Sequence, residues 1–454
     1  MDRVNRSEST ELSAAELLRA ALGVERFIAS CKLSGEQGRL WQRTPEPKSG
    51  APRTFYHGSA GIALFYLELH QATQEARYLQ EAVSAGEELI AYAEHKSFLT
   101  IGFYSGWPGL VFVLNELFKA SGDARFKTGA RLCLEKMRAQ ASDIGAGIGW
   151  VEPMPFSDIT GKTGDREVID LSVGAAGAGV ILLYAHREGL HDQALHWARQ
   201  TADRLLEVAQ HTPDGPRWLM MTDMPFEFTA PNFAHGGAGV AYFIADLATE
   251  TVDNFAGNAN YLEVAIAAAR FVQSRAVPQG SGHLVCHTEE QQPPTLFYLG
   301  VCHGPAGTGR LMYLLNKITG DAQWLDWLHD NMQGLIATGA PERRTAGLWQ
   351  NYGQCCGDAG IGDYALSLHA ATGRAEYLEL AQRIATAALA NADDADGALD
   401  GLAWSQAEHR SRPDFVETQT GYMQGAAGLG SFLLNLATHS GPVSAKIALP
   451  ETPF

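Results

Sequence analysis

Seven copies of a Gly-x-x-Gly pattern run through this chain, and each one opens a strongly apolar segment. They begin at Gly58, Gly106, Gly174, Gly236, Gly304, Gly357 and Gly425, at intervals of 48 to 68 residues. The segments that follow, such as VAYFIADLA and LGSFLLNLA, are nearly all apolar, as expected of helices that are buried on most sides. This repeat predicts an architecture built from stacked helical units.

An amphipathic segment precedes each buried helix, with apolar residues three and four apart and charged residues between them. These segments lie near residues 13–31, 76–95, 123–140, 192–210, 258–275, 321–338 and 375–391. Strict alternation of seven outer and seven inner helices predicts an all-α fold, an α/α toroid (double α-barrel) in one domain over residues 1–454. In this fold the glycines let crowded inner helices approach closely. An open solenoid is the alternative, but its ends need polar caps, and the last repeat is as apolar as the middle ones.

Length and composition agree with a closed repeat. The 454 residues are 46% hydrophobic, which excludes a disordered chain, and they exceed the roughly 250 to 300 residues that one ordinary core holds. The net charge of −17, from 51 acidic and 34 basic residues, argues against nucleic acid or an anionic membrane as partner. The sequence contains neither a signal peptide nor a stretch of about 18 apolar residues. We therefore expect a cytoplasmic protein without stable membrane insertion.

The connections between helices differ on the two faces of the predicted ring. Inner-to-outer connections are tight turns such as Ser121-Gly122-Asp123, whereas outer-to-inner connections are long, as in 141–170, 211–232, 276–300 and 392–422. The long loops all lie at the N-terminal mouth of the inner helices. Long loops usually carry binding and catalysis, so we expect the functional site at this mouth.

The residue before each repeat glycine stands at the start of an inner helix, so the seven of them ring the mouth. In order they are His57, Ser105, Val173, His235, His303, Cys356 and Gln424. Together with Cys302 and Cys355, this places three thiols and two histidines on three consecutive repeats.

The clustered thiols are suited to a metal. Helix N-termini favour thiolate, which is the form that binds metal. Catalytic zinc typically has three protein ligands and an open fourth position, and Cys302, Cys355 and Cys356 fit that count. The remaining cysteines are interpreted as small buried apolar residues: Cys31, Cys133 and Cys286.

The histidines receive different interpretations. His57 faces away across the ring and is interpreted as mouth lining or as a satisfied polar residue. His303 is an alternative ligand, an acid, or merely a neighbour of Cys302, and it ranks below His235.

Three motifs resemble those of the lanthionine synthetase C-like family: AHGGAG at 234–239, CHGPAG at 302–307 and CCGDAG at 355–360. The resemblance implies zinc held by Cys302, Cys355 and Cys356, and an acid/base role for His235. It also matches Asp170, in VIDLSVGAAG, to the family's aspartate. The best-known stand-alone cyclases have Cys-His where this chain has Cys355-Cys356. A third thiolate should leave the site more negative, the bound substrate thiolate more electron-rich, and the reaction less tightly controlled in direction.

The activity implied by the resemblance is that of a lanthipeptide cyclase. A peptide cysteine thiol, activated by zinc, adds to dehydroalanine or dehydrobutyrine in the same peptide and forms a (methyl)lanthionine thioether ring. His235 is the candidate general acid and His303 the second candidate. Asp170 orients a histidine, helps to deprotonate the thiol, or simply caps a helix. The seven repeats occupy the whole chain, so a dehydrated precursor peptide and a separate dehydratase are the expected partners.

The sequence leaves alternatives open. An enzyme of the same fold could add glutathione or another free thiol to dehydroamino acids, and a non-catalytic scaffold could bind peptides around structural zinc. A six-fold α/α barrel glycosidase conflicts with seven repeats and with the lack of paired carboxylates. In the loop 403–424, the residues Glu408, His409, Arg410 and Arg412 are either peptide contacts or a surface ion-pair cluster. Tyr104 and Trp107 either line a substrate channel or belong to the core.

Overall fold

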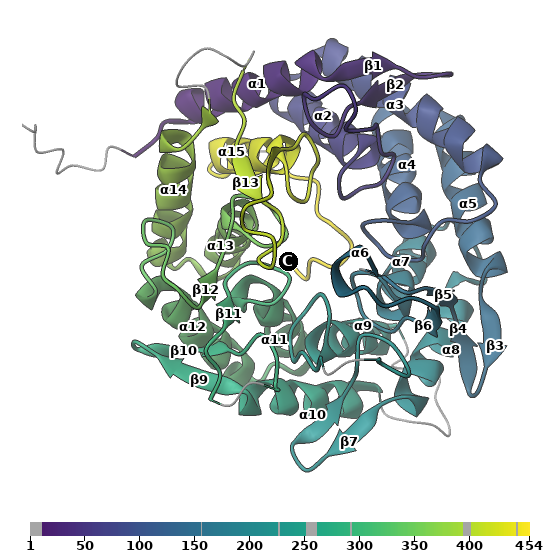
Figure 1. Ribbon diagram of the computed structural model, residues 1–454, viewed down its shortest axis with the longest axis vertical. Coiled ribbons are helices and arrows are strands. Elements are labelled where there is room, and N and C mark those ends of the chain that lie inside the picture. Colours follow the sequence, from purple (N-terminus) through teal and green to yellow (C-terminus); the bar gives the residue numbers. More distant parts are fainter. Residues whose placement is uncertain are drawn as a thin grey trace, which may run out of the picture.

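Two concentric rings of helices make up the protein (Figure 1), as the computed structural model shows. The structure describes residues 11–155, 157–225, 228–250, 261–290, 293–393, 401–441 and 444–454. The inner ring consists of α2 (Ser59–Thr73), α4 (Trp107–Ser121), α7 (Ala175–Arg187), α9 (Gly237–Thr249), α11 (Pro305–Thr319), α13 (Asp358–Thr372) and α15 (Ala426–Thr438). The outer ring consists of α1 (Ala14–Ser30), α3 (Ala76–His95), α5 (Ala124–Ala139), α8 (Ala194–Glu207), α10 (Tyr261–Ser274), α12 (Ala322–Ala337) and α14 (Ala375–Ala390). The predicted all-α toroid of seven inner and seven outer helices is confirmed over the described residues.

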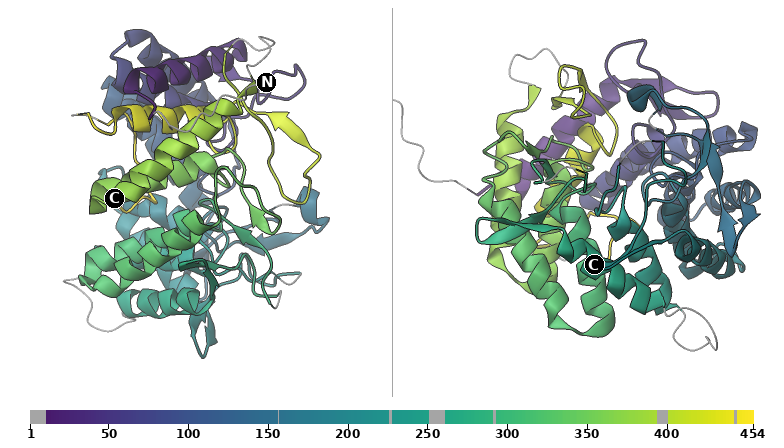
Figure 2. Two further views of the ribbon diagram at one scale, coloured as in Figure 1. Left: turned by 90° about the vertical axis from the view of Figure 1, so that its left-hand side faces the viewer. Right: turned by 60° about the horizontal axis from the view of Figure 1, so that its bottom comes forward.

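The ring is closed by the two ends of the chain. Each inner helix packs against the inner helices of the neighbouring repeats, and α15 completes the circle by packing against α13 on one side and α2 on the other. Six inner helices pack on the outer helix that follows them, whereas α15 packs on α1, the first helix of the chain. The views in Figure 2 show this closed arrangement from two further sides. An open solenoid is thereby excluded.

The repeat glycines serve a purpose that the sequence analysis did not assign. We expected them to let inner helices approach one another, but their closest contacts are with the loop that leads into each helix. A Cβ at Gly236 would collide with the carbonyl oxygen of Ala230, and one at Gly239 with that of Phe233. The loop therefore folds back over the first turn of its helix. Both glycines of the motif are needed for this turn, and the turn sets the residues before the motif at the mouth.

Short two-stranded sheets occupy the outer-to-inner connections, and the sequence analysis did not predict them. They are β1 (Lys32–Ser34) with β2 (Arg39–Trp41), β3 (Ser142–Ile144) with β4 (Gly147–Gly149), β5 (Val151–Pro153) with β6 (Asp165–Glu167), β7 (Gln210–Thr212) with β8 (Gly215–Arg217), β9 (Ala276–Gln279) with β10 (Gly282–Val285) and β13 (Ser405–Ala407) with β14 (Val416–Thr418), all antiparallel. The pair β11 (Phe297–Tyr298) and β12 (Leu348–Trp349) is parallel. The strands β2, β4, β8 and β10 pack against the next outer helix along the chain, namely α3, α8, α10 and α12. A four-residue helix, α6 (Ser157–Thr160), lies in the connection to α7.

The C-terminal segment, residues 444–454, ends in the middle of the ring, where the label C stands in Figure 1. Glu451 is buried there and accepts hydrogen bonds from the Tyr104 hydroxyl at 3.0 Å and from Arg310 at 3.2 Å. Tyr104 and Trp107 are both buried in the main hydrophobic core, which confirms the core interpretation for this pair. Among the described residues, no helix is both long and apolar enough to cross a membrane.

Candidate active site

A circle of residues at the mouth of the ring joins the loops through backbone hydrogen bonds, at every step except the one from Tyr104 to Ser172. Its members are the residues two positions before each repeat glycine: Tyr56, Tyr104, Ser172, Ala234, Cys302, Cys355 and Met423. The amide of Cys302 donates to the Cys355 carbonyl at 3.0 Å, the amide of Cys355 to Met423 at 3.0 Å, and that of Met423 to Tyr56 at 3.0 Å. Ala234 likewise donates to Cys302 at 2.8 Å. This circle sets the side chains of neighbouring repeats at fixed places beside one another.

The three predicted ligand cysteines meet beside this circle, to which Cys302 and Cys355 belong and which Cys356 directly follows. The sulfurs of Cys302 and Cys356 lie 3.3 Å apart and those of Cys355 and Cys356 3.6 Å apart. All six cysteines are free, and these sulfur separations are well beyond the roughly 2 Å of a disulfide. Hydrogen bonds from the other two thiols hold the pKa of Cys355 well below its usual range, whereas burial raises the pKa of Cys302. Cys31, Cys133 and Cys286 are buried elsewhere.

The cluster fits a zinc ion. A tetrahedral ion with sulfur ligands at about 2.3 Å separates those sulfurs by about 3.8 Å, which is close to the spacing in this structure. The ligand atoms of Cys302, Cys355 and Cys356 all lie within 4.8 Å of one another, and within the described part of the chain no histidine or carboxylate joins that group. The protein thus offers three ligands to one ion, which is the donor count of a catalytic zinc site.

His235 and Asp170 form a pair beside the cysteines. The Nδ1 atom of His235 lies 2.7 Å from Asp170 Oδ2, and Asp170 Oδ1 accepts a 2.7 Å hydrogen bond from the backbone amide of Val173. Asp170 therefore both orients the histidine and caps the turn that leads into α7. Burial lowers the pKa of His235, but the Asp170 carboxylate outweighs this effect, and the net shift is upward.

His303 and His287 belong to a different electrostatic environment. The ring of His303 lies 5.4 Å from that of His235 and 4.5 Å from that of His287, measured between centroids. Burial, reinforced by the neighbouring histidines, lowers the pKa of His303 well below its usual value. Burial and Arg410 lower the pKa of His287 to about 3. The pKa values of these two rings are thus lowered, whereas that of His235 is raised.

A cavity of about 650 Å³ opens over the cysteines and the histidines. Its walls include the aromatic rings of Phe228, Tyr298 and Trp349, and Arg410 enters it from the loop between β13 and β14. Arg410 lies near the Tyr298 hydroxyl and partly offsets the rise that burial causes in the pKa of that group. The cavity thus combines apolar walls with a few directed polar groups, as ligand pockets usually do.

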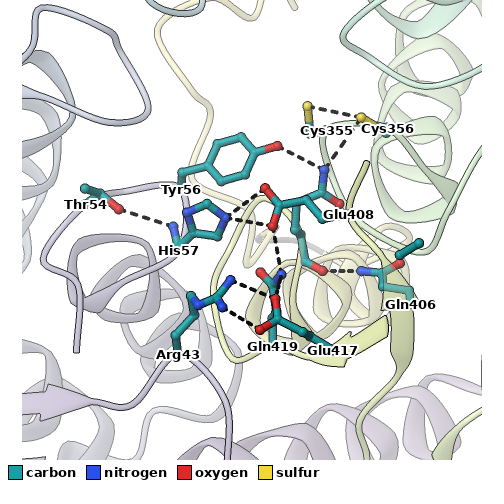
Figure 3. A network of polar contacts seen from close by, with 12 residues as sticks. Arg43, Thr54, Tyr56, His57, Cys355, Cys356, Gln406, Glu408, Glu417 and Gln419 are labelled. Carbon is teal, nitrogen blue, oxygen red and sulfur yellow. Dashed lines mark hydrogen bonds and ion pairs between the residues drawn. The ribbon is translucent and has the colours of Figure 1, made fainter. Parts of the chain in front are cut away.

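Figure 3 shows that Glu408, in the loop 403–424, lies beside His57 of the first repeat. The Glu408 carboxylate lines the cavity and lies 3.0 Å from His57 Nε2, while Gln419 donates to it at 2.8 Å. Burial raises the pKa of Glu408, but the hydrogen bonds from His57 and Gln419 outweigh it and lower the pKa to about 2. His57 is therefore a satisfied polar residue, one of the two interpretations that its position allowed.

Sequence reasoning missed several residues of the cavity. It placed repeat one across the ring from the cysteines, yet Tyr56 lines the cavity together with Gln424, because repeats seven and one follow repeat six around the closed ring. Cys302 and Cys355 lie two residues before their repeat glycines, and Tyr56 lies at the same position in the first repeat. This shared position could have pointed to Tyr56. No comparable pattern marks His287 or Tyr298, which lie in a long connection.

Comparison with known proteins identifies relatives of this chain. The family model described as lanthionine synthetase C-like protein matches residues 50–447. Among curated proteins, none matches the chain. A solved structure of nisin cyclase is similar with a TM-score of 0.59 and 14% identity, covering 86% of this chain and 89% of that one. Weaker similarity extends to the α-1,6-mannanase GH76A from Salegentibacter sp. HEL1_6 (TM-score 0.47, 14% identity, 93% and 98% covered). Cellobiose 2-epimerase from Bacillus thermoamylovorans B4167 shows similarity of the same order (TM-score 0.47, 12% identity, 70% and 86% covered).

Proposed function

The chain belongs to the lanthionine synthetase C-like family, and on that premise we propose that it is a zinc-dependent lanthipeptide cyclase. Its reaction is the addition of a peptide cysteine thiol to dehydroalanine or dehydrobutyrine in the same peptide. The proposal rests on one observation: the three cysteines line one cavity together with His235, and Asp170 pairs with His235 from behind. The name of nisin cyclase, the similar structure, agrees with a peptide substrate.

Cys302, Cys355 and Cys356 are the residues that would hold the zinc ion. When bound, zinc supplies Lewis-acid activation, which makes a coordinated thiol a nucleophile at neutral pH. The protein's three ligands leave the fourth position to the substrate. This count also argues against a purely structural zinc site, which normally has four protein ligands.

His235 is the proposed general acid. The substrate thiol releases its proton to solvent, and solvent returns a proton to His235 at the end of the cycle. The sulfur forms a bond to the β-carbon, and the electron pair of the double bond moves toward the neighbouring carbonyl. The protonated imidazole of His235 then delivers a proton to the α-carbon. Asp170 keeps that imidazole oriented, and its carboxylate raises the pKa of the imidazole, which favours the protonated form. His303, the second candidate, is neutral in this environment and suits a hydrogen-bonding wall of the cavity better than a proton donor.

The dehydrated precursor peptide is the proposed substrate, and a separate dehydratase is the proposed source of its dehydroamino acids. The alternative enzyme, which adds glutathione or another free thiol to dehydroamino acids, would use the same residues. The two differ in where the attacking sulfur comes from.

A synthetic peptide that contains one dehydroalanine and one cysteine separates these functions. We expect the zinc-loaded protein to convert the cysteine thiol into a thioether without changing the mass of the peptide. N-ethylmaleimide should then no longer add to the peptide. The control is the same peptide with serine in place of cysteine, incubated with glutathione. If a glutathione adduct forms on the control peptide and no ring forms in the first peptide, the protein is the enzyme that adds free thiols and not a cyclase. No reaction with either peptide would favour the scaffold.

A further inference from the structure

Two of the three clustered sulfurs lie against polar side chains of other repeats. The Nε2 atom of Gln424 donates to the Cys356 sulfur at 3.6 Å and to the Tyr56 hydroxyl at 2.9 Å. The Tyr56 hydroxyl lies beside the Cys355 sulfur. Figure 3 shows Tyr56 close to the sulfurs of Cys355 and Cys356. Because the Tyr56 oxygen already accepts from Gln424, its own proton is available for Cys355.

The direction of these hydrogen bonds is set by the groups behind them. The Oε1 atom of Gln424 accepts from Asn351 Nδ2 at 2.8 Å, and Asn351 Oδ1 accepts from the Gly353 amide at 3.0 Å. If the oxygen and nitrogen of either side-chain amide, that of Gln424 or that of Asn351, exchanged positions, at least one of these hydrogen bonds would be lost. Gln424 and Asn351 are 1% and 4% exposed. In such a buried network each hydrogen bond to a charged group is stronger than in water.

Cys302 stands apart from this network. Among the described residues, its sulfur is hydrogen-bonded to the other two thiols and to no donor of the kind that Tyr56 and Gln424 provide. The three sulfurs are therefore not equivalent. Cys355 and Cys356 are the adjacent pair, and each has one outside donor.

Charge explains what these donors do. Three thiolates around a divalent ion leave a net charge of −1 in a buried site, and such a charge is costly unless hydrogen bonds compensate it. We propose that Tyr56 and Gln424 are positioning residues that offset this surplus charge, drawing electron density from two thiolates and keeping the ion electrophilic. The inference rests on the proposed function, because it requires the ion to be held by these cysteines.

Cobalt(II) provides a direct probe, because its sulfur-to-metal charge-transfer band reports the electron density of the thiolates. Tyr56→Phe and Gln424→Leu each remove one donor. We expect both variants to bind one equivalent of cobalt with the band shifted to lower energy. We also expect zinc affinity, measured against a chelator, to fall about tenfold in each. The matched control is Tyr104→Phe, at the equivalent position of the next repeat, where the hydroxyl donates to Glu451.

The outcomes separate this inference from the proposed function. Unshifted bands in both variants, with cobalt bound, would overturn the inference and leave the zinc site standing. An equal shift in Tyr104→Phe would overturn it as well, because the effect would then be a general response to packing. Wild-type protein that binds neither metal would instead remove the proposed function, and the inference with it. Should one variant fail to fold, the other decides the matter.

Discussion

The carboxylate of Asp170 lies 2.7 Å from Nδ1 of His235, although the two residues are 65 positions apart in the chain. The second oxygen of the same carboxylate is held by the Val173 amide. The carboxylate is thus fixed on both sides before any substrate arrives. With Nδ1 bonded to Asp170, Nε2 is the atom from which we expect proton transfer.

Asp170→Asn tests this pairing through the pH dependence of ring formation. Asparagine retains an oxygen for the Val173 amide but removes the charge that raises the pKa of His235. A general acid must be protonated, so activity falls as the pH rises through its pKa. We expect the descending limb of the kcat profile to move to lower pH and the rate at pH 8 to fall on the order of 100-fold. A profile of unchanged shape would remove Asp170 from this role.

Comparison of His235→Gln with His303→Gln distinguishes the two candidate acids. Because the pKa of His303 is held well below its usual value, that ring carries no proton to donate at neutral pH. We expect initial rates to fall by roughly 100-fold or more for His235→Gln and by less than about tenfold for His303→Gln. The reverse order, measured on zinc-loaded proteins of equal helix content, would exchange their roles.

Metal content tests the cysteine cluster. We expect about one zinc ion per wild-type chain and a loss of most of it in Cys302→Ala and Cys356→Ala, since each removes one of three ligands. Cys133→Ala is the matched control, because this buried cysteine lies in α5 outside the cluster. Elemental analysis after dialysis against a weak chelator provides the measurement. Full zinc retention in both site variants would show that the metal is bound elsewhere.

The seam that closes the ring should be sensitive to added volume. A Cβ at Gly430, in α15, would lie 2.6 Å from the Phe65 ring of α2 and 3.0 Å from Val24 of α1. We expect Gly430→Ala to destabilise the protein by about 1–3 kcal/mol despite the better helix propensity of alanine. Gly237→Ala in α9 is the control, since nothing lies within 4 Å of its added Cβ.

Thermal unfolding followed by circular dichroism measures both glycine variants. The midpoint should fall for Gly430→Ala and remain the same or rise for Gly237→Ala. An equal change in the two variants would mean that helix propensity, and not packing at the seam, determines the result.

The helical framework could be predicted in detail because its signals are local. The segment expected at 76–95 is α3 (Ala76–His95), and the one expected at 192–210 contains α8 (Ala194–Glu207). The segment expected at 258–275 contains α10 (Tyr261–Ser274), while its first three residues lie outside the described part of the chain. The short hairpins were not predicted, because strands of two to four residues are too short to show an alternating pattern.

Apart from Asp170, which the family resemblance indicated, the candidate site was predicted only where residue type and repeat position coincided. Cysteines before repeat glycines are conspicuous, so the cluster of Cys302, Cys355 and Cys356 could be expected. Tyr56 and Gln424 are ordinary residue types, and one of them is more than 360 positions from the other. The roles proposed for Asp170, His235 and His303 remain predictions until the experiments above are done.

Periodicity in the sequence determined the number of helices, their buried faces and the end of the ring at which the site lies, because each of these depends on residues only a few positions apart. Only the tertiary structure decided which side chains face the sulfurs. That depends on how α15 closes against α1 and α2, and contacts across such a seam are set by the packing of the whole ring, which no local pattern records.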